Sequence, residues 1–474
     1  TSHAILANRV SFLLGLNGPS APIDTACSSS LVAIHRALES IHTGSSDMAI
    51  VGGVQVMLTP AAFISFGAAG LLSEDGKTKS FDARADGYVR GEGSGAIFLK
   101  PLDMAEADGN HIYAVIKATA ENHGGRATML TAPNPTLQAE LLIEAYQKAE
   151  IDPTTVGYIE CHGTGTSLGD PIEFQAMKKA FSELYKKHQK APAVKPHIGL
   201  SSVKSNIGHL ETAAGISGVL KVLLALKHKQ IPALLHFEQL NSYVNLEGTP
   251  FYIVDKTMPW EAIQGANGNL LPRVAGVSSF GFGGANAHII FEEYLPVTNG
   301  FSSQTDGSHL IILSAKNEDR LKAYAQLMLT HVEKQEVDLA NFAYTLQVGR
   351  DEMPERFAVV VSGMDDLKNK LAAFLKSDGN LNGQFRNNTQ KNKGRFQSLV
   401  DGKAGKAFVQ TLIEQKDFTK LAELWAFGVD IDWRALHIAT GRKRMSLPTY
   451  PFARERCWPI NRTTDDTTKH HQKS

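Results

Sequence analysis

The feature that most constrains the fold is the regular order of short apolar runs and amphipathic segments between residues 48 and 226. The apolar runs have the length of buried strands, and the longer segments carry apolar residues at helical spacing. The pattern predicts strands at 48–54, 96–99, 112–118, 156–159 and 198–203, and helices at 137–149, 171–187 and 210–226. Strands that alternate with helices are typical of α/β proteins, so the sequence predicts an α/β fold.

A lone cysteine lies where an extended segment meets a helix. Cys27 stands in the segment 24–30, DTACSSS, and apolar residues recur at helical spacing from Leu31 to Ile41. The hydroxyl residues before Leu31 favour a helix N-terminus there. Free backbone N–H groups and the helix macrodipole stabilise a thiolate at such a terminus, so Cys27 is a candidate nucleophile. The alternative is a small buried core residue.

Two histidines follow apolar runs that have the character of buried strands. His162 comes after the run 156–159, and His209 comes after the run 198–203; both lie in turn-forming, glycine-containing segments. The ends of these predicted strands and the extended segment before Cys27 can meet at one place. The sequence therefore predicts a site that contains one thiol and two imidazoles.

Charge and composition exclude several other functions. The 48 Lys and Arg residues balance the 48 Asp and Glu residues, so no overall basic field attracts nucleic acid or anionic lipid. There is no apolar run of the roughly 18 residues that a membrane span needs and no secretory leader. The segment 91–95 lacks the Lys-Ser/Thr of a phosphate loop, so no nucleotide is expected. A large cytoplasmic enzyme of more than one domain fits these observations.

The cysteines indicate neither a metal centre nor a disulfide framework. The chain has three, Cys27, Cys161 and Cys457, and their spacing matches no metal-ligand pattern. We therefore expect no metal and a reducing environment. Cys457 and Trp458 are expected to pack on an apolar surface.

Four motifs occur in a fixed order along the chain: DTACSSS at 24–30, ECHGTGTSLGDPIE at 160–173, SVKSNIGHLETAAG at 202–215 and GVSSFGFGGANAH at 276–288. With these motifs the chain resembles the β-ketoacyl synthase family, most closely the ketosynthase domains of modular polyketide synthases. The resemblance runs from Ala7 to about Glu293. It implies a decarboxylative Claisen condensation, in which an acyl chain on the cysteine reacts with a malonyl unit on a carrier protein.

The resemblance also implies a role for each motif residue. Cys27 accepts the acyl chain, and the backbone N–H groups of Cys27 and Phe282 form the oxyanion hole. His162 and His209 donate hydrogen bonds to the enolate that forms during decarboxylation, and Lys204 orients the site and biases its electrostatics. No departure at these positions marks a homologue that has lost elongation.

Two glycine-containing loops have both a functional and a structural interpretation. The resemblance implies that Thr164 and Thr166 hydrogen-bond the phosphopantetheine arm of the carrier protein; alternatively, they cap the turn before Asp170. It also implies that Phe282, between Gly281 and Gly283, gates the entry of the second substrate. The alternative there is a tight turn between two strands, and both interpretations can hold together.

The family fold is a thiolase-like layered arrangement built from two similar halves. By resemblance, residues 1–297 form a ketosynthase domain that lacks its N-terminal portion, so the chain is expected to be a fragment that is inactive alone.

Beyond a linker near 297–307, the pattern predicts strands at 309–314 and 356–362 and helices at 317–334, 338–348 and 365–376. The expected units are a small α/β flanking subdomain at 308–378, a mobile polar loop at 379–405, a helix at 407–426 with the post-ketosynthase linker within 406–460, and a disordered tail at 461–474.

The segments 122–126 and 131–135 resemble those of ketosynthases whose acyltransferase is a separate protein. Consistent with that, the chain has no Gly-x-Ser-x-Gly acyltransferase motif. The resemblance implies three partners: an acyl carrier protein, a separate acyltransferase and a second copy in a homodimer. No cofactor is expected to be bound by the domain itself. The alternatives are a non-elongating acyl-transferring ketosynthase, a fatty-acid-type synthase and a non-enzymatic scaffold.

Overall fold

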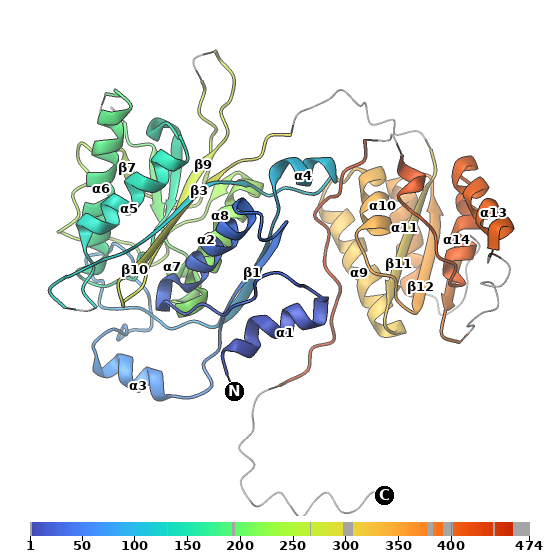
Figure 1. The fold of residues 1–474 in the computed structure, drawn as a ribbon, viewed down its shortest axis with the longest axis horizontal. Helices are drawn as coiled ribbons and strands as arrows, with labels where there is room; N and C mark the ends of the chain where they lie inside the picture. The colour runs from blue at the N-terminus through green and yellow to red at the C-terminus, as the bar shows by residue number, and fades with distance from the viewer. Residues whose placement is uncertain are drawn as a thin grey trace, which may run out of the picture. The chain divides into compact units, whose positions relative to one another are not determined.

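The structure is a computed structural model that describes residues 2–129, 131–191, 195–265, 267–296, 307–376, 383–391, 400, 402–438 and 441–457. The chain forms two compact units, shown in Figure 1. Unit 1 comprises residues 1–104 and 112–296, and unit 2 comprises residues 105–111 and 297–474. Among the described residues, no helix is long and apolar enough to cross a membrane.

Unit 1 is built on a six-stranded sheet with the order β3-β10-β9-β4-β5-β7. The strands are β3 (Val115–His123), β4 (Val156–Glu160), β5 (Ile198–Ser201), β7 (Phe251–Ile253), β9 (Val274–Phe280) and β10 (Ala285–Glu292). β3, β10 and β9 run antiparallel, whereas β9, β4, β5 and β7 run parallel. Every residue of β9 is buried, because this strand lies in the middle of a sheet that is covered on both faces.

Helices cover both faces of this sheet (Figure 1). α5 (Pro135–Lys148) and α6 (Gly169–Lys187) pack on one face, and α2 (Ser29–His42) and α8 (Ala214–His228) pack on the other. Alternate residues of β10 therefore enter different cores: Ile290 joins the α5 and α6 side, and Ile289 joins the α2 and α8 side. Asn134 caps α5 through its side chain, and Pro135 occupies the first turn.

A second sheet packs on the far side of α2 and α8. It consists of β1 (Ala49–Gln55) and β2 (Gly93–Leu99), which pair antiparallel. The described part of unit 1 thus forms four layers, in the order helices, sheet, helices, sheet. The α/β fold expected from the sequence is confirmed. The remaining elements of unit 1 are α1 (Ala4–Leu14), α3 (Ala61–Ala68), α4 (Leu102–Ala107, which extends into unit 2), α7 (Lys204–Ile207), β6 (Gln230–Ile231) and β8 (Met258–Pro259).

Unit 2 is a three-stranded antiparallel sheet with helices and its own apolar core. The sheet has the order β11 (His309–Ala315), β12 (Glu355–Val361) and β13 (Gln384–Asn388). The helices are α9 (Glu318–Lys334), α10 (Leu339–Val348), α11 (Met364–Lys376), α13 (Gly402–Gln415) and α14 (Phe418–Ala426). Asn317 caps α9 and Asp338 caps α10, which explains why both helices begin where the sequence predicts.

Several expectations for the second half of the chain are wrong. The segment predicted as a mobile loop contains β13, which pairs with β12 through residues 384–388. The single helix predicted at 407–426 is two helices, α13 and α14, separated by Lys416 in a left-handed conformation. Cys457 is exposed rather than packed on an apolar surface. Trp458, the linker at 297–306 and the tail at 461–474 lie outside the described residues.

Candidate active site

Cys27 lies in a tight turn at the start of α2. A 3₁₀ turn, η1 (Ala26–Ser28), precedes the helix, and Ala26 has φ 56°. This left-handed conformation is unfavourable for a residue with a Cβ, and the side chain of Asp24 supports it by accepting a hydrogen bond from the Ala26 N–H at 3.0 Å. The residues before the turn, expected from the sequence to be an extended segment, form no β-strand. Cys27 is therefore positioned by a turn and not by a strand end.

The sequence predicts that the hydroxyl residues around Cys27 cap α2, and this prediction is wrong. Ser28, the residue before the helix, makes no capping hydrogen bond. It donates instead to the Thr25 carbonyl at 3.0 Å, and Ser29 donates to the Ala26 carbonyl at 2.6 Å. The Ser30 hydroxyl accepts from the Ile216 N–H in the first turn of α8. These bonds fix the shape of the turn and tie it to α8.

His162 lies in the loop after β4. Its ring Nδ1 accepts a hydrogen bond from the Phe280 N–H at 3.3 Å. The carboxylate of Glu173, in α6, accepts hydrogen bonds from the backbone N–H groups of His162 and Gly163 at 2.7 and 2.8 Å. Both the ring and the backbone of His162 are therefore held by backbone amides and a buried carboxylate.

His209 follows β5 and the short helix α7. Its ring Nδ1 accepts a hydrogen bond from the Glu211 N–H at 2.8 Å. Its own N–H donates to the Val89 carbonyl at 2.6 Å, and its side chain is almost completely buried. Tyr88 packs against the ring, with the ring centroids 4.9 Å apart.

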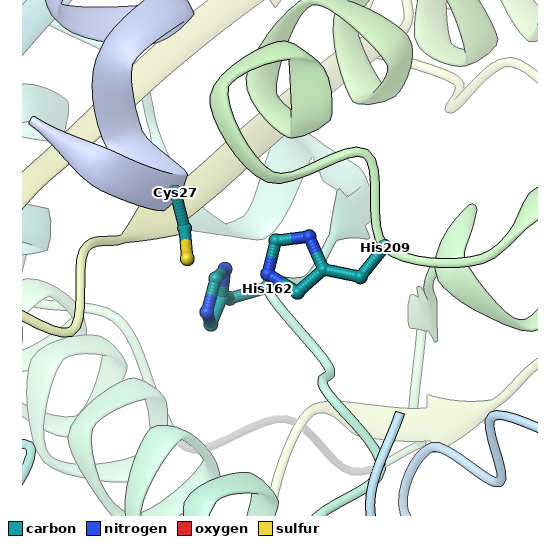
Figure 2. A group of neighbouring side chains, drawn as sticks. All are labelled: Cys27, His162 and His209. Carbon is teal, nitrogen blue, oxygen red and sulfur yellow. The ribbon is translucent and has the colours of Figure 1, made fainter. Parts of the chain in front are cut away.

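The structure brings the thiol and both imidazoles together, as the sequence predicts (Figure 2). The Cys27 sulfur and one ring nitrogen from each of His162 and His209 lie within 4.8 Å of one another. The two rings are nearly perpendicular, with centroids 5.9 Å apart. The Nδ1 atom of each ring accepts a backbone hydrogen bond, so in the neutral ring the proton is on Nε2. Both rings are therefore hydrogen-bond donors at Nε2.

This tautomer bears on whether the three residues hold a metal. Their atoms are close enough to be considered as a ligand set. A metal-bound imidazole, however, must offer a lone pair, whereas the Nδ1 lone pairs are taken by backbone N–H groups and Nε2 carries the proton. The arrangement favours hydrogen-bond donation to a substrate oxygen over metal ligation.

Burial keeps both imidazoles neutral. It lowers the pKa of His162 and of His209 well below the ordinary value, and the positive charge of Lys204 lowers both further. Each ring therefore remains an uncharged donor at neutral pH.

Burial disfavours the Cys27 thiolate that the helix terminus predicts. Burial raises the pKa of the Cys27 thiol to about 11. The positive charge of Lys204 and hydrogen bonds from the backbone N–H groups of Phe282 and Cys27 oppose this shift but do not cancel it. The helix terminus favours a thiolate, but removing the negative charge from water has the larger effect on the pKa.

Lys204 lies at the start of α7 and is buried. Its Nζ donates to the His162 carbonyl at 2.5 Å. Burial lowers its pKa, while Cys27, Glu160, Glu173 and Asp170 favour its charged form. The Lys204 ammonium group therefore interacts through its charge with both the Cys27 sulfur and the buried carboxylates.

The loop that carries Phe282 is a tight turn between β9 and β10. The Gly281 N–H donates to the Ala285 carbonyl at 2.7 Å. A Cβ at position 281 would lie 2.4 Å from the Thr25 carbonyl oxygen, whereas a Cβ at Gly283 would meet nothing. Gly281 thus permits the loop to approach the Cys27 turn. The Phe282 side chain is 53% exposed, and its N–H points to the sulfur, which is the position required of an oxyanion-hole donor.

Thr164 and Thr166 project from the same side of their loop, with their hydroxyl oxygens 3.2 Å apart. The Thr166 hydroxyl also accepts a hydrogen bond from the Gly169 N–H at 3.2 Å. Thr166 therefore contacts the first turn of α6, which agrees with the structural alternative of capping the turn before Asp170. The Thr164 hydroxyl makes no hydrogen bond to α6 among the described residues, whereas the Thr164 backbone N–H bonds the Asp170 carboxylate.

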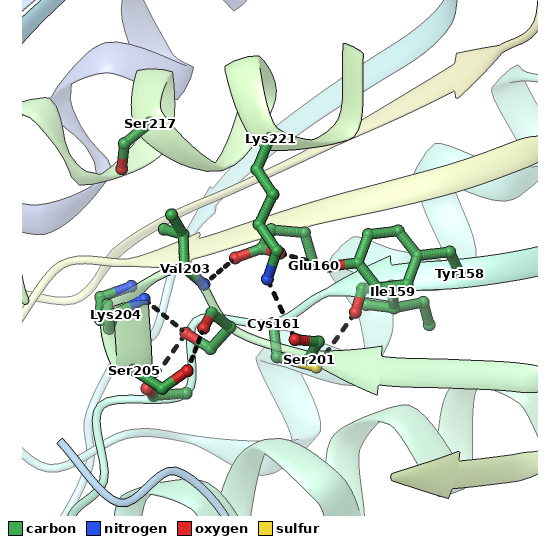
Figure 3. Close-up of polar contacts among 12 residues, drawn as sticks. Tyr158, Ile159, Glu160, Cys161, Ser201, Val203, Lys204, Ser205, Ser217 and Lys221 are labelled. Atoms are coloured by element: carbon green, nitrogen blue, oxygen red, sulfur yellow. Dashed lines mark hydrogen bonds and ion pairs between the residues drawn. The ribbon is translucent and has the colours of Figure 1, made fainter. Parts of the chain in front are cut away.

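Sequence reasoning missed the buried charges behind these residues. Glu160, at the end of β4, accepts hydrogen bonds from the Val203 N–H at 2.5 Å and the Tyr158 hydroxyl at 2.5 Å, and it pairs with Lys221 of α8 at 2.9 Å (Figure 3). Asp170 accepts from the backbone N–H groups of Phe81 and Gly165.

Burial raises the pKa of Asp170 to about 6 and that of Glu173 to about 7. A signal was present, because Glu160, Asp170 and Glu173 all lie within the second motif. The partners of Glu173 lie within the same motif, whereas Phe81, Val203 and Lys221 come from other segments of the chain.

Family models match both units. The β-ketoacyl synthase N-terminal domain matches residues 1–105, the β-ketoacyl synthase C-terminal domain matches residues 113–238, and the RhiE-like KS-MAT linker domain matches residues 312–378. The chain belongs to the β-ketoacyl synthase family, and its fold is the thiolase-like ketosynthase fold.

Within that family the chain is similar to ketosynthases of bacterial polyketide synthases. It is 49% identical to polyketide synthase PksN of Bacillus subtilis over 97% of this chain, which spans only 8% of that protein. The ketosynthase from module 6 of the bacillaene synthase of Bacillus subtilis 168 is 42% identical, with a TM-score of 0.88 over 97% of this chain and 78% of that one. An oxazolomycin ketosynthase domain, OzmH KS7 from Streptomyces albus JA3453, is 37% identical, with a TM-score of 0.84 over 97% of this chain and 73% of that one.

Proposed function

We propose that this chain carries the active site of an elongating ketosynthase, which joins a Cys27-bound acyl chain to a malonyl unit with loss of CO₂. One observation supports this most directly: the sulfur and one ring nitrogen from each of two imidazoles lie within 4.8 Å of one another. A transferase of this kind needs a nucleophile to hold the acyl group and donors to stabilise a developing oxyanion.

In the first half-reaction the Cys27 sulfur attacks the carbonyl carbon of an acyl thioester on a carrier protein. A new carbon–sulfur bond forms, the bond to the carrier sulfur breaks, and the Cys27 proton ends on the departing carrier thiol. The N–H groups of Cys27 and Phe282, which hydrogen-bond the sulfur in the free protein, stabilise the tetrahedral oxyanion.

In the second half-reaction a malonyl thioester loses CO₂, and negative charge develops on its thioester oxygen. His162 and His209 donate their Nε2–H groups to that oxygen, and their neutral state costs no proton transfer at this step. The enolate carbon attacks the Cys27-bound carbonyl, so a carbon–carbon bond forms and the Cys27 carbon–sulfur bond breaks. The sulfur then takes a proton from solvent.

The proposal includes the partners that the chemistry requires. An acyl carrier protein presents both substrates on its phosphopantetheine arm, which Thr164 and Thr166 contact. A separate acyltransferase loads the malonyl group, the ketosynthase works as a homodimer in the cytoplasm, and the domain binds no cofactor of its own.

The test uses the native polypeptide that carries this chain, incubated with an acyl-carrier thioester and analysed by mass spectrometry. We expect an acyl adduct on Cys27, which Cys27→Ala abolishes. His162→Ala retains the adduct but loses condensation with malonyl carrier. Absence of the adduct in the wild type would favour a scaffold. An adduct without malonyl turnover would favour a non-elongating acyl transferase.

A further inference from the structure

We propose that Glu211, clamped by Arg90, is a positioning residue that fixes the ring of His209 for the decarboxylation step. The inference rests on the proposed function and assigns to Glu211 and Arg90 a role that the four motifs do not. It follows from the contacts that surround the loop between α7 and α8.

Glu211 controls the tautomer of His209 through its backbone. Its N–H donates to Nδ1 of His209 at 2.8 Å, and this bond places the ring proton on Nε2. The bond exists because Glu211 adopts φ 45°, in the left-handed region. This region is unfavourable for a residue with a Cβ, and such a conformation persists only where the surroundings impose it. Something must therefore hold Glu211 in place.

The side chain of Glu211 supplies that hold. Its carboxylate accepts hydrogen bonds from Nε and Nη2 of Arg90, the latter at 3.1 Å, and from Nε2 of Gln55 at 2.6 Å. A two-pronged contact between a guanidinium and a carboxylate fixes orientation as well as distance. Gln55 lies at the end of β1, so the clamp joins two segments that are remote in sequence to the His209 loop.

Arg90 is itself firmly placed. Its side chain is only 4% exposed, and its guanidinium lies over the rings of Phe63 and Phe66 of α3, at 4.5 and 5.4 Å from their centroids. The backbone on both sides of Arg90 also bonds His209: Val89 accepts from the His209 N–H, and the Gly91 N–H donates to the His209 carbonyl at 2.9 Å. One short segment thus holds His209 by its main chain and, through Glu211, by its ring.

The clamp acts on one half-reaction. Neither Glu211 nor Arg90 makes a hydrogen bond to Cys27 or Phe282 among the described residues, and those two residues serve acyl loading. The Glu211 carboxylate acts on Cys27 only through its negative charge, which raises the pKa of the thiol, so its removal does not slow loading. Decarboxylation requires the Nε2–H of His209 to point at the thioester oxygen. A displacement of about 1 Å in such a group can cost about 100-fold in rate. Loss of the clamp should therefore slow decarboxylation selectively.

The experiment measures two rates in the native polypeptide: acyl loading of Cys27 and decarboxylation of a malonyl-carrier thioester. For Glu211→Ala we expect decarboxylation to fall about 100-fold, whereas loading stays at the wild-type rate or rises, because the negative charge that raises the Cys27 pKa is gone. Glu211→Gln, whose amide oxygen still accepts from Arg90, should restore most of the rate. In a His209→Ala background, Glu211→Ala should slow decarboxylation no further, because the ring that it positions is gone.

A matched control separates positioning from stability. Arg273 and Glu293 form another ion pair in unit 1, at 2.7 Å and with similarly low exposure. Arg273→Met should lower the unfolding midpoint without changing the ratio of the two rates. Equal losses of loading and decarboxylation in Glu211→Ala, or additive losses in the His209→Ala background, would overturn the positioning role. If the wild type neither loads nor decarboxylates, the proposed function itself fails; if it does both and Glu211→Ala matches it, only this inference fails.

Discussion

The interiors of the two units differ in how much charge they bury. Among the described residues, the buried charged side chains of unit 1 are Lys79, Asp82, Arg90, Glu160, Asp170, Glu173, Lys204 and Lys221, whereas Arg356 is the buried charged side chain of unit 2. Unit 2 encloses a cluster of aliphatic and aromatic residues from its sheet and helices. Five of the charged residues of unit 1, in contrast, lie in β4, α6, α7 and α8, the elements that flank the loops carrying His162 and His209.

The difference shows that unit 1 buries charges near its candidate active site although their burial lowers stability. Removing a charge from water costs several kcal/mol, and a buried pair recovers this only with good geometry and further hydrogen bonds. Among the described residues, unit 2 carries this cost only at Arg356, which pairs with Glu352 at 2.8 Å. Unit 1 accepts it around the site, where fixed charges and amides hold the neutral imidazoles and the thiol in place before any substrate binds.

Breaking a buried pair in unit 1 is the strongest test of this contrast. Lys221→Met leaves Glu160 buried without its cation (Figure 3), and we expect a loss of about 3–5 kcal/mol in unfolding free energy. Urea unfolding followed by tryptophan fluorescence measures the loss. The double variant Lys221→Met with Glu160→Gln should recover part of it, because no unpaired charge remains. Equal stability of the wild type and the single variant would contradict the prediction.

An apolar substitution in unit 2 provides the opposite case. Leu371 in α11 is fully buried, and Leu371→Ala should cost about 2–5 kcal/mol through lost burial and a cavity. The rate of Cys27 acylation by the folded protein should stay at the wild-type value, since every contact described for the site comes from unit 1. A matched surface variant, Leu327→Ala, changes a side chain that is 39% exposed and should have little effect on either measurement. A parallel fall in acylation would show that the units are coupled.

The contrast also explains which features the sequence predicts. The helices at 317–334 and 338–348 were predicted to within a residue, because periodicity and a capping Asn or Asp coincide there. Cys27, His162, His209 and Lys204 were identified because each lies in a motif. For β9 the sequence predicts no bounds, only the alternative of a turn between two strands at Gly281. Its run of small and polar residues, with Gly276 and Ser278, lacks alternation because both faces are covered.

The site residues that escaped prediction are held by contacts between distant segments. Arg90 meets Glu211 across 121 positions, and Glu160 meets Val203 across 43. A local pattern carries no information about such pairs. The raised pKa of Cys27 was missed for the same reason, because burial depends on the packed chain and not on the turn alone.

The pKa of Cys27 gives a smaller but direct test of the buried site. Since burial raises it to about 11, the thiol is protonated at neutral pH and its thiolate fraction grows as pH rises toward that value. Alkylation of Cys27 by iodoacetamide should therefore increase about tenfold per pH unit between pH 7 and 9. An ordinary free thiol levels off above about pH 8.5. Peptide mapping by mass spectrometry follows the rate at Cys27, with exposed Cys457 as an internal reference. A rate of Cys27 alkylation that levels off near pH 7 would contradict the raised pKa and favour the thiolate expected from the helix terminus.

The smallest expected effect separates the two roles of Thr164 and Thr166. The Thr166 hydroxyl bonds the Gly169 N–H at the start of α6, and the Thr164 hydroxyl bonds Thr166. Loss of a cap of this kind costs about 0.5–2 kcal/mol, so Thr166→Ala should destabilise the protein by that amount and Thr164→Ala by less.

If both hydroxyls also contact the carrier arm, both variants should raise the KM for the acyl carrier with little change in kcat, because such contacts bind ground state and transition state alike. The conservative variants Thr164→Ser and Thr166→Ser retain the hydroxyls and should behave as the wild type. Stability loss in Thr166→Ala with an unchanged KM in both alanine variants would leave only the structural role. The two threonines would then resemble Lys204 and Glu160, whose side chains near the site bond to other segments of the chain.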